Sequence, residues 1–73
     1  MGSKITMKVR FNASRERFEK FGQNTYLVYL PFDQDKDSIN VLIGLLSRNI
    51  GVPLGRIEYA GQDVNKNWIF ELL

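Results

Sequence analysis

The sequence contains no cysteine and no histidine. Without cysteine the chain cannot form a disulfide, a thiolate nucleophile or a sulfur-ligated zinc site. Without histidine it lacks the commonest general base and the commonest nitrogen ligand for metals. These absences exclude Ser-His-Asp catalysis, Cys-His catalysis and histidine zinc sites. We therefore expect a protein that is not an enzyme and that uses no metal or other cofactor.

Long apolar runs are also missing. No segment approaches the roughly 20 apolar residues of a membrane-spanning helix, and the N-terminus lacks the apolar core of a signal peptide. Together with the lack of cysteine, this predicts a cytoplasmic protein with no membrane partner. The chain has 73 residues, of which 44% are hydrophobic and 25% charged. This predicts one folded domain over residues 1–73, with residues 1–3 as a candidate disordered leader.

Hydrophobic periodicity predicts four strands and one helix. Polar and apolar side chains alternate strictly over residues 4–11, which is typical of a half-buried strand. Residues 25–30, 56–60 and 67–72 are rich in aromatic and β-branched types and are also expected to be strands. Apolar residues recur at helical spacing over residues 39–50, and Gly51 provides a C-terminal stop. Residues 12–24 fit no single pattern and are expected to form an irregular connection.

This order of strand, strand, helix, strand, strand predicts an α+β fold. We expect two layers, a mixed four-stranded sheet with one main helix packed on one face. The helical crossover should make the strands on either side of it parallel if they share a sheet. The turn after residue 60 should make the last two strands antiparallel.

Two groups of carboxylates are candidate sites. Asp33, Asp35 and Asp37 are spaced like the start of a calcium-binding loop, but the glycine and the glutamate needed later in such a loop are missing. We interpret these side chains as favouring the positive end of the helix that follows. Three further carboxylates near the last turn could in principle perform acid-base chemistry, but we expect surface side chains there. They belong to Glu58, Asp63 and Glu71.

Positive charge is concentrated in the first part of the chain. Residues 1–30 carry six basic and two acidic side chains, a net +4, and the remainder carries −2. Lys4, Lys8 and Arg10 share one side of the first strand, and Tyr29 should stand beside them if the first two strands pair. The plain interpretation is a solvated face whose lysines discourage aggregation. Cations beside an exposed aromatic ring are also what a single-stranded nucleic-acid binder uses, so weak binding of single-stranded RNA is an alternative function.

Several segments resemble the YggU-like family of small uncharacterised proteins. The resemblance is carried by residues 8–14, 26–30, 38–43 and 49–53 and by Ala60-Gly61. It implies a two-layer fold with a mixed four-stranded sheet and a polar patch to which Asn12, Asn40, Gly61 and Lys66 would belong. Residues 33–38 and Val64-Asn65 depart from the family pattern, so most basic members of that patch are lost. The resemblance implies an uncharacterised, non-enzymatic binding or scaffold domain.

The chain also resembles, less closely, a ubiquitin-like β-grasp domain, which would imply a protein-interaction module. The first connection is long for that fold, and the chain ends without the Gly-Gly tail used in conjugation. In a β-grasp domain the first and last strands are parallel neighbours at the sheet centre. Three apolar residues, Leu27, Ile69 and Leu73, are expected on the outward face or the terminal edge. They predict a protein partner or a weak homodimer as alternatives to a monomer.

Overall fold

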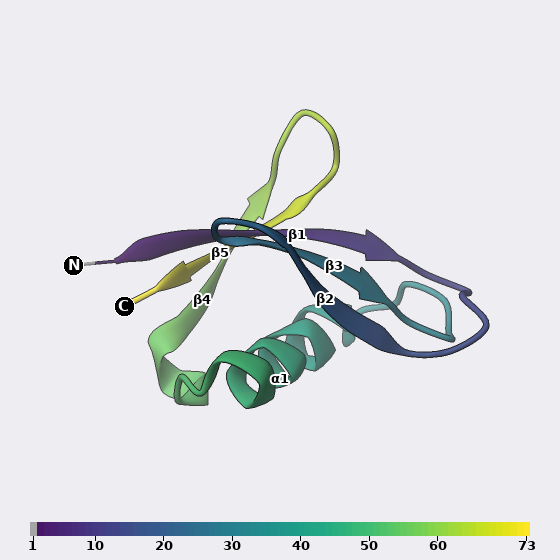
Figure 1. Cartoon of the computed structure of the whole chain (residues 1–73), viewed down its shortest axis with the longest axis horizontal. Coiled ribbons are helices and arrows are strands. Elements are labelled where there is room, and N and C mark those ends of the chain that lie inside the picture. The colour runs from purple at the N-terminus through teal and green to yellow at the C-terminus, as the bar shows by residue number, and fades with distance from the viewer. Residues whose placement is uncertain (1) are drawn as a thin grey trace.

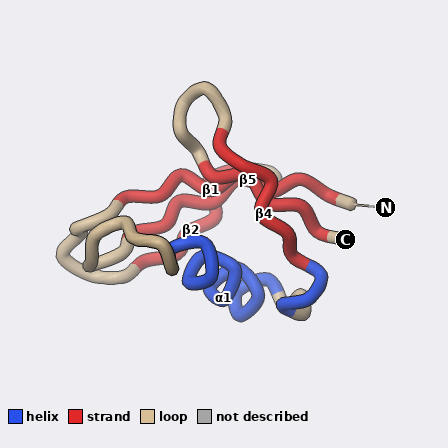
Figure 2. The backbone as a smooth tube through the Cα atoms, turned by 180° about the vertical axis from the view of Figure 1, so that it is seen from behind, coloured by secondary structure: helices blue, strands red, loops and turns tan. Residues whose placement is uncertain are grey.

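The strands form one mixed sheet against which a single α-helix packs, so the class is α+β (Figures 1 and 2). The structure is a computed structural model that describes residues 2–73. In chain order the elements are β1 (Ser3–Arg10), β2 (Arg17–Gly22), β3 (Thr25–Tyr29), α1 (Ser38–Ile50), the 3₁₀ turn η1 (Leu54–Arg56), β4 (Ile57–Gln62) and β5 (Trp68–Leu72). The expected helix and four expected strands are confirmed to within two residues at each end.

The sheet has five strands, in the order β2-β3-β1-β5-β4. β1 lies at the centre, parallel to β3 and antiparallel to β5. The two edge strands are added by antiparallel hairpins, β2 to β3 and β4 to β5. β3 and β4, which flank the helix in the chain, therefore run in the same direction, although β1 and β5 separate them. The first and last strands are neighbours, but they are antiparallel, unlike those of a β-grasp domain.

The expectation of four strands and an irregular segment at residues 12–24 was wrong, because β2 lies within that segment. Phe18 and Phe21 are three positions apart, a spacing that also fits one face of a helix. In a strand the same spacing sends them to opposite faces, so Phe18 packs against the core while Phe21 is 64% exposed. β2 also has only one neighbouring strand and little buried apolar surface. Its sequence therefore lacks the apolar alternation by which strands are recognised.

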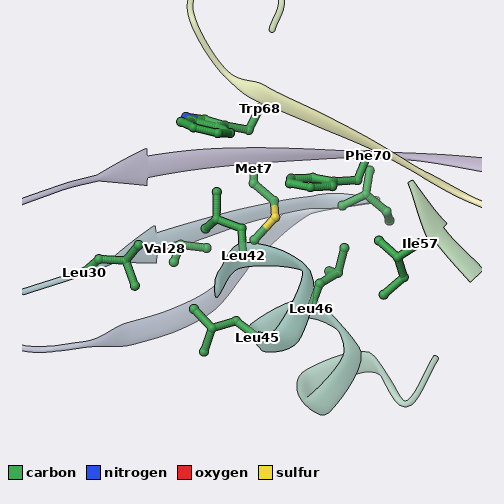
Figure 3. Close-up of a cluster of buried hydrophobic side chains, with 10 residues drawn as sticks. Met7, Val28, Leu30, Leu42, Leu45, Leu46, Ile57, Trp68 and Phe70 are labelled. Atoms are coloured by element: carbon green, nitrogen blue, oxygen red, sulfur yellow. The ribbon is translucent and has the colours of Figure 1, made fainter. Parts of the chain in front are cut away.

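The core lies between the sheet and α1 (Figure 3). Alternation along β1 sends Ile5 and Met7 to the helix side, and both are buried. Leu42 and Leu46 of α1 meet them there. The largest fully buried side chain is Phe70 on β5, whose ring centroid lies 5.4 Å from that of Tyr59. Burying one such side chain stabilises the fold by about 1.5–3 kcal/mol.

Local hydrogen bonds define both ends of α1. At the start, Asp35 Oδ1 accepts a hydrogen bond from the backbone N–H of Asp37, and Ser38 Oγ accepts one from the N–H of Asp35. Asp37 is the N-cap residue but makes no side-chain capping bond. At the end, Gly51 has φ 74° and donates its N–H to the carbonyl of Ser47. A residue with a Cβ would be strained in that left-handed conformation.

The N-terminal residues join the sheet earlier than expected. Ser3 is the first residue of β1 and is paired with Leu72 of β5. Met1, part of the candidate leader, lies outside the described residues. Within residues 2–73, no helix has both the length and the apolar character needed to span a membrane.

Candidate nucleic-acid interface

The sheet face opposite α1, which we call the open face, carries the basic side chains singled out in the sequence. Strand alternation places Lys8 and Arg10 on this face, because their neighbours Met7 and Val9 pack toward the helix. The parallel register pairs Lys8 with Leu27 and Arg10 with Tyr29. The expectation that Tyr29 stands beside the cations of the first strand is therefore confirmed. β3 and β1 together present cations, an aromatic ring and an aliphatic side chain on one surface.

Two aromatic rings on the open face each lie next to a cation. The Lys8 Nζ is 5.7 Å from the centroid of the Phe21 ring. The guanidinium carbon of Arg17 is 5.8 Å from the centroid of the Tyr29 ring, and Arg17 also forms an ion pair with Glu19. Phe21 was missed in the sequence because its segment was not recognised as a strand. A cation near an aromatic ring is attracted by the negative face of the ring.

The loop between β4 and β5 rises from the open face, on the side away from α1 (Figures 1 and 2). Between this loop and the sheet lies a hollow of about 290 Å³, which we call the loop hollow. Its lining consists of Lys8, Val9, Arg10, Leu27, Asn65, Lys66 and Asn67. The fold thus brings Lys66 beside two cations that are more than fifty positions earlier in the chain.

Asp63 organises the β4–β5 loop. Its Oδ1 accepts hydrogen bonds from the backbone N–H groups of Asn65 and Asn67, at 2.9 Å each, and its Oδ2 accepts one from Asn67 Nδ2 at 3.1 Å. The N–H of Asn67 is the main cause that lowers the pKa of Asp63, and partial burial opposes it. The Asn67 side chain, the N–H of Asn65 and the nearby charge of Lys8 lower this pKa further. The ionised carboxylate therefore holds the loop in place.

Lys4 is separated from the other cations of the open face. Its partner across to β5 is Glu71, and Glu71 is in turn paired with Glu58 on β4. Lys8 lies four residue steps along the strand from Lys4, a distance of about 13 Å. The open face is therefore divided into an acidic end around Lys4 and a basic end around Lys8 and Arg10. Of the four nucleic-acid contacts expected from the sequence, the structure groups Lys8, Arg10 and Tyr29.

The four residues of the family patch lie in different places. Asn12 follows β1 in a turn with φ 59° and donates its N–H to the carbonyl of Phe32. Asn40 is on α1, which covers the opposite face of the sheet. Gly61 has φ 98° at a β-bulge in β4, and Lys66 lines the loop hollow. The fold does not bring these residues together as one patch.

The described part of the chain has two further hollows, one beside the sheet and one on the helix. One, of about 650 Å³, lies beside the β1–β2 loop and is lined by Ala13, Ser14, Arg15, Glu16, Arg17 and Tyr29. The other, of about 350 Å³, follows the outer side of α1 and includes Val41, Leu45 and Leu54. The first adjoins the open face through Tyr29 and adds Arg15 to the cations near that ring.

The carboxylates considered for metal or acid-base chemistry do not converge on a site. Asp35 and Asp37 are held by the hydrogen bonds that start α1. Glu58 and Glu71 are exposed partners across two strands. Among residues 2–73, no three side chains of the metal-binding types gather into a group. The lowered pKa of Asp63 is opposite in direction to the raised pKa that a general acid needs.

No protein-family model, curated protein or solved structure matches the chain. The residues of the open face and the loop hollow are therefore the basis for a proposed function.

Proposed function

We propose that this chain is a non-enzymatic binding domain whose open face binds single-stranded nucleic acid, such as RNA, weakly. One observation carries the proposal. Lys8, Arg10 and Lys66 converge on a sheet surface that also holds two aromatic rings, Phe21 and Tyr29. A sheet face that combines exposed aromatic rings with cations matches the chemistry of unpaired nucleotides, because bases stack on rings and phosphates attract cations.

The pairing of each ring with a cation supports this mode of binding. Lys8 lies over Phe21 and Arg17 over Tyr29. When a phosphate binds the cation, the ring is freed for a base, and the planar Arg17 guanidinium can itself stack on a base. Stacking of a base on an aromatic side chain is worth about 1–3 kcal/mol. The bases of a duplex are already stacked on one another, so we expect single strands to bind better.

Electrostatics sets the expected strength of binding. The net charge of the chain is only +2, and the acidic end of the open face repels phosphate. About three cations are placed to neutralise phosphates, which gives a slope of log affinity against log salt of about −2 for a single strand. Binding of this kind is strongest at low salt and fades near physiological salt.

A protein partner is the competing occupant of the same face. Val64, at the tip of the β4–β5 loop, is 97% exposed, and Leu73 is 48% exposed. These side chains could contact another protein or a second copy of this chain, and sedimentation at high concentration would detect a homodimer. From the sequence features described above, we also propose a cytoplasmic location and membership of the YggU-like family.

Competition between single and double strands tests the proposed function. A labelled single-stranded RNA bound at low salt should be displaced by the same unlabelled strand and poorly displaced by its duplex. Fluorescence anisotropy measures both competitions. Absence of binding at low salt would contradict the proposal.

A further inference from the structure

We propose that the loop hollow binds the terminal phosphate monoester of a single-stranded nucleic acid. The inference rests on the proposed function, since it assigns one end of the bound strand to a place on the open face. Three features of the hollow support this assignment. They are its position beside the raised loop, its charge and its preformed geometry.

The β4–β5 loop forms a wall at one side of the aromatic surface. It stands up from the open face (Figures 1 and 2), whereas β2 and β3, which carry Phe21 and Tyr29, lie on the other side of β1 in the sheet. A strand whose bases stack on those rings and whose backbone runs toward β1 meets Asn65 and Lys66 in the wall. The chain of nucleotides therefore ends in the hollow or has to turn away from the sheet there.

The charge of the hollow fits a monoester better than an internal phosphate. Three cations, Lys8, Arg10 and Lys66, line it, and the nearby carboxylate of Asp63 feels the positive charge of Lys8. An internal phosphodiester carries one negative charge. A terminal monoester carries about −1.5 to −2 at neutral pH and has three strong acceptor oxygens. It can therefore pair with more of these cations at once, and the amide side chains of Asn65 and Asn67 supply further donors.

The wall is held in one conformation by hydrogen bonds within the loop. The Asp63 carboxylate accepts three of them, as described above. Gln62 Nε2 donates to the carbonyl of Lys66, and the N–H of Lys66 donates to the carbonyl of Asp63. Lys66 has φ 63°, a left-handed conformation that is unfavourable for a residue with a Cβ. Asp63 is thus a positioning residue, which fixes Lys66 and Asn65 against the sheet before any ligand arrives.

The volume leaves room for a terminal phosphate together with part of its nucleotide. About 290 Å³ is close to the lower end of the range for small-ligand pockets, which begins at roughly 300 Å³. The monoester could stand at either the 5′ or the 3′ end of the strand, because both present the same oxygens. The experiment therefore compares the two ends.

Three labelled RNA oligonucleotides of one sequence test the inference. One carries a 5′-phosphate, one a 3′-phosphate and one neither, each with its dye at the opposite or an internal position. We expect one phosphorylated form to bind about tenfold tighter than the unphosphorylated one, since hydrogen bonds between charged groups are the strong ones. Lys66→Asn should abolish this preference, because asparagine tolerates the left-handed conformation but lacks the charge. Lys20→Asn, on the helix side of β2, is the matched control and should retain it.

The outcomes separate the two proposals. Equal binding of all three oligonucleotides would contradict the terminal-phosphate inference and leave the proposed function standing. No binding of any of them at low salt would contradict the proposed function as well. A preference that survives Lys66→Asn in the folded protein would show that the phosphate binds outside the loop hollow, and would also overturn the inference.

Discussion

The Lys8 ammonium lies 5.7 Å from the centroid of the Phe21 ring, although the two residues are on β1 and β2 and β3 runs between them. The lysine side chain therefore extends across the open face above its register partner Leu27. This contact joins the basic centre of the sheet to an exposed ring on the edge strand. It makes Phe21 part of the proposed interface.

Replacing Phe21 with alanine should weaken RNA binding and leave stability almost unchanged. Loss of one stacking platform costs about 1–3 kcal/mol of binding free energy. The side chain is mostly exposed, so the free energy of unfolding should change by no more than about 0.5 kcal/mol. Anisotropy titration and urea denaturation measure the two quantities. If the folded variant bound RNA with unchanged affinity, Phe21 would not be part of the interface.

The division of the open face into acidic and basic ends predicts unequal effects of two lysines on the same strand. Lys8→Ala should weaken RNA binding several-fold, because it removes a cation from the loop hollow. Lys4→Ala should have little effect, since Lys4 lies beside Glu71. Both variants lose one charge, so each serves as the control for the other. Equal losses of affinity would mean that only the total charge of the protein matters.

The sequence was sufficient to predict the elements whose residue pattern is local. Strict alternation over residues 4–11 predicted β1, and helical spacing followed by Gly51 predicted α1 and its C-terminal end. The sequence did not predict β2, because the few apolar residues of this strand point to opposite faces of the sheet. The loop hollow could not be predicted either, because Lys66 meets Lys8 only through the pairing of β1 with β5 and the turn that Asp63 holds.

Asp63 should titrate below the usual aspartate pKa of about 3.9 in the folded protein. A lowered pKa in the folded state means that the ionised carboxylate stabilises the fold above the unfolded pKa. This contribution is lost as the pH falls through the folded pKa. NMR titration should show the amide signals of Asn65 and Asn67 moving together with the Asp63 carboxylate, and Asp63→Asn should remove the shared titration. A pKa at or above the usual value would contradict the proposed role of Asp63 in the loop.

Phe70→Ala should test the core as the structure describes it. Phe70 is fully buried between the sheet and α1, so its truncation should lower the free energy of unfolding by about 3–5 kcal/mol. For a domain of this size that loss could unfold the protein. Leu54→Ala, at a side chain that is 60% exposed, is the comparison and should cost far less. If urea denaturation showed a similar loss of unfolding free energy in the two variants, the packing of Phe70 in the core would be contradicted.

The most direct test of the central claim compares RNA binding by the unaltered protein, over a range of salt concentrations, with RNA binding by the Lys8→Glu, Arg10→Glu double variant. Titration of labelled single-stranded RNA should give a slope of log affinity against log salt of about −2 for the unaltered protein. The double variant should lose binding at low salt. A matched variant, Lys20→Glu, Arg48→Glu, changes the net charge equally away from the open face and should still bind. Binding that is absent from the unaltered protein at low salt, or equal in the two variants, would contradict the account.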